Sequence, residues 1–508
     1  MTAALKNIVE AAQEMGADSP RTAKPSVAEV RRAVDGGRSA QYPDAEHLTT
    51  DTANAKRIAR YFADELAYAP AGWHVWDGKR WALDDDAATA VCARVGRIVM
   101  QEAAALSERA ATESDSGRRK TQGEQAAALM KFSANSENIG RILAAKTLAQ
   151  SMLKRATEDF DADPLLVNCT NGVVDLRTGN LLPHDRYLRL TKLAGCDFDP
   201  EAKCSTWLDF LADVFSCNVE LVNFAQRLVG YFLTGLTRED VLAIFYGTGA
   251  NGKTTLLRII MAVMGDYARP APAGLFDARH DSRDDQRIAV LWARRMIVGQ
   301  ETERGARLAE AFIKNATSSD RQSGRHLYGE PFDFTPTHKL VLATNHRPRV
   351  TGTDYGIWRR LLLVPFEATF RADSGNLDPR MPEKLTAELP GVLAWAVQGA
   401  IEWQRDGLRP PALVRAATEA YRREEDVVAQ FVDDRCAIDP HSEELSGNVY
   451  RDYKAWCEDA GARPVSQRGL VDQLAHLGVK PEKGAKGRRF LAGIRLQGGA
   501  GGALRAIS

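Results

Sequence analysis

A glycine-rich segment that ends in lysine and threonine carries the clearest chemistry in this sequence. It reads GTGANGKT over 247–254, which gives the spacing GxxxxGK[ST]. Glycines let successive backbone N–H groups turn inward around phosphate oxygens. The spacing predicts that Lys253 contacts the β- and γ-phosphates of ATP and that Thr254 holds Mg²⁺. The residues predicted to bind ATP are Gly247, Gly249, Asn251, Gly252, Lys253 and Thr254.

Two further apolar runs end in polar side chains that suit the same reaction. The run 295–299 is followed by Glu301 and Glu303, and the run 339–344 is followed by Asn345. Glu301 is placed to act on Mg²⁺ or on the attacking water, with Glu303 as the second candidate. The alternative for Glu301 is an ordinary solvated strand end. The amide of Asn345 is placed to orient water against the γ-phosphate.

A pair of arginines, Arg359 and Arg360, precedes the apolar run 361–364. Arginines in this position suit an arginine finger, whose charge stabilises the transition state of phosphoryl transfer. The alternative is a surface pair that forms salt bridges.

These side chains need a scaffold, and the apolar runs predict one. The runs 241–246, 295–299, 339–344 and 361–364 alternate with helical segments, which predicts an α/β core with a parallel sheet. The first run leads directly into the glycine-rich loop, and residues with helical spacing follow it, so the loop joins a strand to a helix. We expect 268–287 to be a long polar loop inside this core.

Outside the core the pattern is mixed. The Asp77–Gly78 pair lies among Trp73, Trp76 and Trp81, which predicts a β-hairpin whose tryptophans either pack in a small core or stack on bases. We expect 110–125 to be a polar loop between helices. The predicted regions are a disordered tail (1–50), an N-terminal α+β domain (51–205), a helical linker or collar (206–240), the ATPase core (241–410) and a C-terminal helical domain (411–508).

The C-terminal region is basic within a neutral chain. From residue 460 onward there are nine basic and two acidic residues, a net charge of +7. Two helical patterns followed by a basic glycine-rich ribbon predict a winged-helix-like unit that binds DNA. The alternative is a solvated turn in a packing domain. The predicted DNA contacts are Lys480, Lys483, Lys486, Arg488 and Arg489.

Composition limits the class of protein. The 508 residues are 44% apolar, and 67 basic side chains balance 67 acidic ones, which excludes a collagen, a coiled-coil rod and a chain that is disordered throughout. The seven cysteines contain no CxxC, which favours free thiols. Without an apolar stretch of about 18 residues or a signal-peptide pattern, we expect no membrane association. Free thiols suit a reducing cytoplasm, and the high usage of Ala, Arg and Asp suits a GC-rich host, so we expect a location in the cytoplasm of a bacterial host.

The motifs together resemble the superfamily 3 helicases of the AAA+ class, in particular the phage and plasmid primase-helicases related to the poxvirus nucleoside triphosphatase-helicase. The resemblance rests on GTGANGKTTLL, QETERGARLAEAFIKNATSSD, RHLYGEPFDFTPTHKLVLATNHRP and GTDYGIWRRLLLVPF, and more loosely on NGVVDLRTGNLLPHD. It implies that Glu301 is the second acidic position of the Walker B motif, that Gln300 replaces the first, and that Glu303 shares the metal role. It also implies that Asn345 is the sensor asparagine and that Arg360, or else its neighbour, is the finger.

The resemblance further implies a hairpin over 325–334 that grips single-stranded DNA. Its alternative is a hairpin that packs on its own subunit through two phenylalanines. The residues predicted to contact DNA here are Arg325, His326, Tyr328 and Lys339.

The function implied is an ATP-driven DNA helicase of phage or mobile-element replication. It would form a homo-hexameric ring on single-stranded DNA and hydrolyse ATP between subunits, with origin duplex DNA and a separate primase or initiator as further partners. Because only about 160 residues precede the recognisable connecting region, we expect no priming activity. Two alternatives stay open. One is an ATPase that remodels or packages nucleic acid without strand separation, and the other is an initiator whose ATPase switches assembly.

Overall fold

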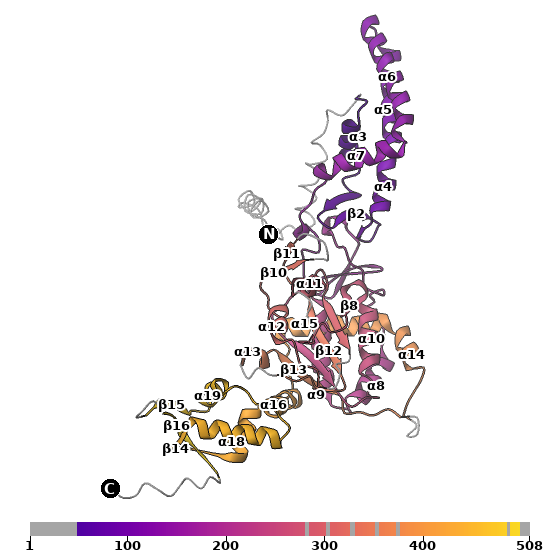
Figure 1. The fold of residues 1–508 in the computed structure, drawn as a ribbon. Helices are drawn as coiled ribbons and strands as arrows, with labels where there is room; N and C mark the ends of the chain where they lie inside the picture. The colour runs from indigo at the N-terminus through magenta and orange to yellow at the C-terminus, as the bar shows by residue number, and fades with distance from the viewer. Residues whose placement is uncertain are drawn as a thin grey trace, which may run out of the picture.

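The computed structural model describes residues 48–279, 284–300, 305–325, 331–350, 355–371, 376–484 and 488–497. The molecule is elongated, with an N-terminal unit at one end, a central α/β region, and a C-terminal unit at the other end (Figure 1). Almost all of the predicted tail, 1–50, lies outside the described residues. Within the described part of the chain, no helix is long and apolar enough to cross a membrane.

A five-stranded parallel sheet forms the centre. In spatial order its strands are β13 (Leu361–Pro365), β7 (Leu242–Tyr246), β12 (Lys339–Thr344), β9 (Met296–Gln300) and β8 (Ala268–Pro270). The apolar runs predict four of these strands, and β8 is the one they do not predict. The strand β12 lies between β7 and β9, so the segments that follow these three strands open at the same carboxyl edge of the sheet.

Helices cover both faces of this sheet. One face packs against α8 (Ser205–Val214), α9 (Val219–Leu233), α10 (Lys253–Met264) and α15 (Leu389–Asp406). The other packs against α11 (Asp284–Ala289), α12 (Glu310–Ala316), α13 (Tyr355–Trp358) and α16 (Ala412–Glu425). The helices of 206–240 are therefore part of the central core.

The helices α9 and α15 approach each other backbone to backbone. A Cβ on Gly230 would lie 2.1 Å from the backbone nitrogen of Ala400, and one on Gly399 would lie 2.0 Å from the carbonyl oxygen of Gln226. Only glycine fits these two positions without a shift of the helices.

The N-terminal unit packs three helices against a small antiparallel sheet. Its elements are α3 (Asp51–Tyr61), β1 (Leu66–Ala69), β2 (Gly72–Trp76), β3 (Trp81–Leu83), α4 (Asp85–Ala93) and α7 (Ile139–Met152). The predicted hairpin is confirmed, because β2 pairs with β3 around Asp77–Gly78. Trp73 and Trp81 are 2% and 3% exposed, so they pack in the core and offer no face to a base.

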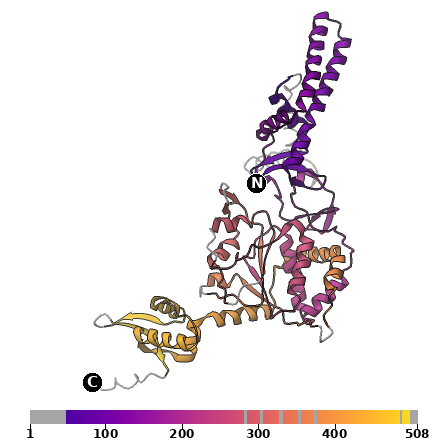
Figure 2. The ribbon, with the colours of Figure 1, turned by 45° about the vertical axis from the view of Figure 1, so that its right-hand side comes forward.

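A long helical hairpin projects from this unit (Figure 2). It consists of α5 (Val95–Thr112) and α6 (Ser116–Ser136). The prediction of a polar loop over 110–125 is wrong, because only 113–115 separate the helices. The facing apolar side chains, such as Leu106 and Leu129, are buried, and Asp115 accepts a hydrogen bond from the Arg118 backbone N–H at 2.7 Å. The polar residues of this segment belong to exposed helix surface.

A second antiparallel sheet connects the N-terminal unit to the central region. Its strands are β4 (Leu166–Cys169), β5 (Gly172–Asp175) and β6 (Asn180–Leu182). Short 3₁₀ helices span Thr157–Asp159, Arg186–Leu188 and Gly265–Tyr267.

The central region departs from the sequence prediction at 268–287. We expected a polar loop there, but Ala268–Pro270 is the edge strand β8 and α11 begins at Asp284. Residues 280–283 lie outside the described part of the chain. A three-residue strand is too short to give a recognisable alternation of apolar residues. A pair of antiparallel strands precedes β12, because β10 (Gln322–Arg325) pairs with β11 (Pro331–Phe334). The first strand begins earlier than the predicted range 325–334, and residues 326–330 lie outside the described residues.

The C-terminal unit follows α14 (Met381–Ala387), α15 and α16. It comprises α17 (Val427–Arg435), β14 (Cys436–Leu445), α18 (Ser446–Asp459), α19 (Gln467–His476), β15 (Lys480–Lys483) and β16 (Arg489–Leu496), with strand order β14-β16-β15. It has its own core, which includes Phe431, Tyr453 and Leu474. Two helices followed by a basic hairpin are present as predicted, and β14 adds a third strand.

Candidate nucleotide site

The glycine-rich loop joins β7 to α10, as the sequence predicts. Gly249 and Gly252 have φ angles of 104° and 82°, in the left-handed region that favours glycine. At Gly247 the constraint is space, because a Cβ would lie 2.2 Å from Asn251 Nδ2 and 2.3 Å from the carbonyl oxygen of Phe366. The conformation of the loop therefore depends on glycine at these three positions.

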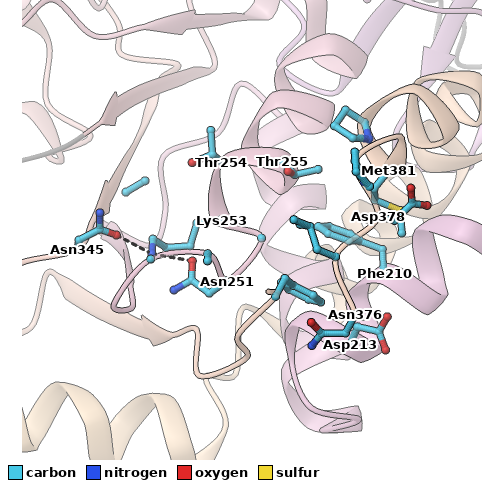
Figure 3. Close-up of a pocket in the computed structure, with 18 of the residues that line it drawn as sticks. Phe210, Asp213, Asn251, Lys253, Thr254, Thr255, Asn345, Asn376, Asp378 and Met381 are labelled. Carbon is cyan, nitrogen blue, oxygen red and sulfur yellow. Dashed lines mark hydrogen bonds between the residues drawn. The ribbon is translucent and has the colours of Figure 1, made fainter. Parts of the chain in front are cut away.

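Lys253 is the first residue of α10, and its side chain is buried beside the loop. Its Nζ donates hydrogen bonds to the Gly247 carbonyl oxygen at 2.8 Å, to Asn251 Oδ1 at 2.9 Å and to Asn345 Oδ1 at 3.1 Å (Figure 3). All three of these acceptors are neutral. Because burial removes water from the ammonium group, the pKa of Lys253 is lowered to about 8. An anionic ligand would supply the charge that these partners lack.

Asn345 meets Lys253 because of the order of the strands. The strand β12 lies beside β7, and Thr344 pairs with Tyr246 at the carboxyl end of both strands. The residue after β12 and the loop after β7 therefore start side by side. The structure brings together the predicted phosphate-binding lysine and the predicted sensor asparagine.

A cavity of about 480 Å³ opens beside the loop. Residues 249–255 line one end, together with Gln300 and Asn345. The other end is formed by side chains that sequence reasoning missed. They are Phe210 and Asp213 of α8, together with Asn376, Asp378 and Met381 (Figure 3). Phe370, Leu377, Pro379 and Pro382 also line the cavity, and the Phe370 backbone N–H donates to the Ala250 carbonyl oxygen of the loop at 2.6 Å. The only signal for α8 was its amphipathic pattern, which predicts burial and gives no indication of a ligand.

The predicted metal ligands are only partly described. Thr254 is exposed and lines the cavity, as does Gln300 at the end of β9. Glu301 and Glu303 lie outside the described residues. Among those that are described, no group of three or more His, Cys, Asp or Glu side chains is arranged to hold a metal ion. The metal roles of Thr254, Glu301 and Glu303 therefore stay predictions.

The two arginines before β13 differ in their surroundings. Arg360 donates hydrogen bonds to Thr317 Oγ1 at 3.1 Å and to the Gly356 carbonyl oxygen at 2.8 Å, so its own chain holds it. Arg359 is exposed. Of the two, Arg359 is the more accessible to another molecule, and the role of either arginine as a finger stays a prediction.

The prediction that Lys339 contacts DNA is wrong. Its side chain is 3% exposed, and its Nζ donates to the carbonyl oxygens of Thr234 and Thr337. Burial lowers the pKa of Lys339 well below its ordinary value. The physical reason is that Lys339 begins β12, a strand that is covered on both faces, and its ammonium ties this strand to the end of α9.

The β10–β11 hairpin packs on its own subunit at its base. Phe334 is buried, and the ring of Phe332 lies 5.3 Å from that of Trp292. Arg325 at the end of β10 is partly buried. His326 and Tyr328 lie outside the described residues, so their DNA role stays a prediction.

The basic C-terminal ribbon is a hairpin with exposed charges. Lys480 and Lys483 lie on β15, and Arg488 and Arg489 lie at or just before the start of β16. All four side chains are exposed. Lys486 lies outside the described residues.

Two family models match this chain. Residues 55–216 match one described as D5 N terminal like, which extends from the N-terminal unit through α8. Residues 245–360 match one described as a family of unknown function (DUF5906), and this range contains the loop, Asn345 and the arginine pair.

The chain is similar to proteins of large DNA viruses that are named putative helicases or putative primases. It is 25% identical to a putative helicase of Acanthamoeba polyphaga mimivirus, over 59% of this chain and 33% of that protein. It is 27% identical to a putative helicase of Frog virus 3, over 60% of this chain and 32% of that protein. It is 24% identical to a putative primase of African swine fever virus, over 59% of this chain and 34% of that protein.

These relatives support a replication protein of the helicase or primase type. The aligned region is about a third of the length of each of these relatives. Because one relative is named a primase, the expectation that priming activity is absent is not supported. The phage origin and the bacterial cytoplasm stay predictions. Among solved structures, the NrS-1 C-terminal region matches with a TM-score of 0.39 and 11% identity, over 58% of this chain and 77% of that one.

Proposed function

We propose that this chain is an ATP-hydrolysing motor of the helicase type that acts on DNA during replication of a virus or mobile element. The observation that carries the proposal is the hydrogen bond between Lys253 and Asn345 at the end of the cavity. It joins the phosphate-binding lysine and the sensor amide at one point. The similarity to viral helicases supports the same class.

Some residues at this end of the cavity would bind the phosphates, and others would assist hydrolysis. The backbone N–H groups of 249–254 and the N-terminus of α10 would hold the phosphates. Lys253 would neutralise charge on the β- and γ-phosphates, and Asn345 would orient the attacking water. Magnesium, held by Thr254 and Glu301, would supply further positive charge on the phosphate oxygens.

The nucleobase would occupy the opposite end of the cavity. Phe210 and Met381 provide apolar surface there, and Asp213 and Asn376 provide polar groups close by. An apolar cleft with a few polar groups is the usual form of a small-molecule site. This division would place the sugar between α8 and α10.

We assign the finger to Arg359 and expect it to act on a neighbouring subunit. The arginine pair lies at the amino end of β13, since the Leu242 backbone N–H donates to the Arg360 carbonyl oxygen at 2.7 Å. The nucleotide cavity lies at the carboxyl edge of the same sheet. A five-residue strand is about 16 Å long, which is too far for an arginine to reach the γ-phosphate of its own chain. A homo-hexameric ring would present Arg359 to the next site.

The exposed C-terminal hairpin would contribute to DNA binding. Its lysines and arginines suit contacts with phosphates, which hold nucleic acid irrespective of sequence.

Replacement of Lys253 tests the ATP site. In Lys253→Ala a methyl group cannot replace the ammonium, and loss of a transition-state charge contact costs several kcal/mol, so ATPase activity should fall by about 10²-fold or more. Phosphate release by the purified chain, with and without single-stranded DNA, measures it. Lys131→Ala, which changes an exposed lysine on α6, is the matched control. Wild-type turnover in Lys253→Ala would contradict the site.

A forked-duplex assay then separates the possible activities. Strand displacement that requires hydrolysable ATP and is lost in Lys253→Ala supports a helicase. DNA-stimulated ATPase without displacement would favour a remodelling ATPase.

A further inference from the structure

A group of basic side chains lies where the N-terminal unit meets the amino edge of the central sheet. We call it the junction cluster and define it as Arg80, Lys192, Arg269 and Arg294. Arg80 comes from the β2–β3 turn, Lys192 follows β6, Arg269 lies on β8, and Arg294 precedes β9. Four separate segments of the chain thus bring positive charge to one place.

Contacts with one residue, Asp266, hold most of this cluster together. Arg80 forms an ion pair with the Asp266 carboxylate, which also accepts a hydrogen bond from the Leu193 backbone N–H at 3.2 Å. The Arg294 guanidinium donates to the Asp266 carbonyl oxygen. Arg269 lies on β8, three residues after Asp266, and its charge repels that of Arg294.

The cluster carries more positive charge than its carboxylates balance. Lys192 Nζ donates to Thr191 Oγ1 at 3.0 Å. In the described ranges, no ion pair joins Lys192, Arg269 or Arg294 to a carboxylate. Two further acids lie nearby. Asp77 forms an ion pair with Arg80 at 3.4 Å, and Asp161 accepts hydrogen bonds from the hydroxyl and the backbone N–H of Thr191, so four cations face three carboxylates. Burial lowers the pKa of Lys192 and that of Arg294, and repulsion between neighbouring cations adds to both shifts. A bound anion would relieve this repulsion.

We propose that the junction cluster binds the phosphodiester backbone of the nucleic acid on which the motor acts. The side chains reach the surface: Arg80 is 31% exposed, Lys192 and Arg294 are partly exposed, and Arg269 on the edge strand is exposed. Charged groups from separate segments along an open surface suit a row of phosphates. The cluster lies at the amino edge of the sheet, whereas the nucleotide cavity opens at the carboxyl edge, so the two ligands do not compete.

This contact would connect the two units mechanically. Arg80 belongs to the N-terminal unit, and Arg269 and Arg294 belong to the central sheet. A strand bound at the cluster would therefore touch both units. The inference rests on the proposed function, because DNA is the ligand expected of such a motor, but the site itself is separate from the nucleotide cavity and from the C-terminal hairpin.

Charge reversal at Arg269 tests the proposal. Arg269 is exposed, so Arg269→Glu leaves packing intact. Arg258→Glu, at an exposed position on α10, makes the same change of charge elsewhere and is the matched control. Fluorescence anisotropy of a labelled oligothymidylate, titrated with the full chain without ATP at several salt concentrations, measures affinity and its salt dependence.

We expect Arg269→Glu to weaken binding about tenfold or more at low salt and to reduce the log–log salt slope by about 0.7 for each lost phosphate contact. Arg258→Glu should stay near wild type. A second variant, Arg294→Gln, should weaken binding in the same direction, and thermal unfolding of each variant reports whether it folds.

Three results would overturn the proposal. The first is that the wild-type chain does not bind the oligonucleotide. The second is that Arg269→Glu and Arg258→Glu have the same affinity and the same salt slope. The third is that the variants of the cluster have a lowered unfolding midpoint but unchanged binding. The last would make the cluster a purely structural joint. Binding is measured without ATP, so this test is independent of ATPase activity. If the wild-type chain has no ATPase activity, the proposed motor is refuted. If Arg269→Glu nevertheless weakens DNA binding, the proposal for the junction cluster still holds.

Discussion

Lys253 is a buried cation whose hydrogen-bond partners, two amide oxygens and one carbonyl, are all neutral. Such an arrangement is costly in the free protein, because neutral acceptors only partly replace water around an ammonium group. A phosphate would offset this cost at the moment of binding. In the proposed motor, the same residue would link the structure of the loop to the affinity for nucleotide.

We expect nucleotide affinity to fall as the pH rises through about 8. The pKa of Lys253 in the free protein is about 8, so below this pH the lysine is already charged and binding needs no proton. Above it, phosphate binding must take up a proton, and the Kd should rise by up to about tenfold per pH unit. Calorimetric titration with a non-hydrolysable ATP analogue, in buffers of different ionisation enthalpy near pH 7 and pH 9, measures this uptake.

The sign for stability is the opposite one. The folded pKa of about 8 lies below the ordinary value of 10.5, so between these pH values the unfolded chain binds more protons. The unfavourable contribution of charged Lys253 to the stability of the free protein is therefore present in full below about pH 8 and disappears as the pH rises toward 10.5. Lys253→Arg is the control for both effects, since a guanidinium stays charged throughout.

If nucleotide binding to Lys253→Arg still takes up a proton above pH 8, another group is responsible for that uptake.

At the scale of elements, the position of α9 against the sheet depends on two glycines. Gly230 and Gly399 remove the side chains that would separate α9 from α15, and both helices belong to the core behind the nucleotide loop. Helix propensity alone favours alanine at both positions. Packing and propensity therefore make opposite predictions for the same substitution.

Gly399→Ala should destabilise the central region by about 1–3 kcal/mol, because its methyl group would overlap the Gln226 carbonyl oxygen. Gly123→Ala in α6 is the matched control. No atom lies within 4 Å of its added Cβ, and it should stabilise the hairpin by about 0.5–1 kcal/mol. Urea unfolding, followed by probes of each unit, measures both. Stabilisation by Gly399→Ala would show that the helices are not in backbone contact.

The sequence predicted those elements whose pattern is local. Four of the five strands of the sheet, the loop before Lys253 and the position of Asn345 follow from apolar runs and from residues at fixed spacing, whereas β8 was not predicted. The wall formed by Phe210 and Asp213 could not be predicted, because it depends on how α8 packs against a loop some 40 residues later. The prediction for Lys339 failed for a related reason. A charged residue at the start of a strand suggests an exposed position, and only the structure shows that its ammonium is buried and bonded to carbonyl oxygens.

For the whole molecule, the two edges of the sheet separate two kinds of chemistry. The carboxyl edge holds the nucleotide cavity, and the amino edge holds Arg359, Arg294 and the base of the β10–β11 hairpin. In the proposed motor, hydrolysis in one subunit would affect the amino edge of the same subunit through the sheet and the helices packed on it, or the site of a neighbour directly through Arg359. The second route requires assembly.

Assembly gives the last prediction, that Arg359 acts in trans. A monomer should then be nearly inactive even if it binds ATP, and specific activity should rise steeply with protein concentration, as measured by phosphate release alongside sedimentation. Arg359→Ala and Lys253→Ala proteins should each be inactive. Arg360→Ala is the matched control, because that side chain is bonded within its own chain. It should retain more activity than Arg359→Ala.

Mixing the two inactive proteins tests the geometry directly. Some interfaces in a mixed ring would combine an intact Lys253 on one side with an intact Arg359 on the other, so partial ATPase activity should return when subunits exchange. A finger that served its own chain would give no such recovery, because every subunit would still lack one of the two residues. Full activity of Arg359→Ala in assembled rings would instead make the arginine pair structural. The strand separating it from the cavity would then be the reason that it plays no part in hydrolysis.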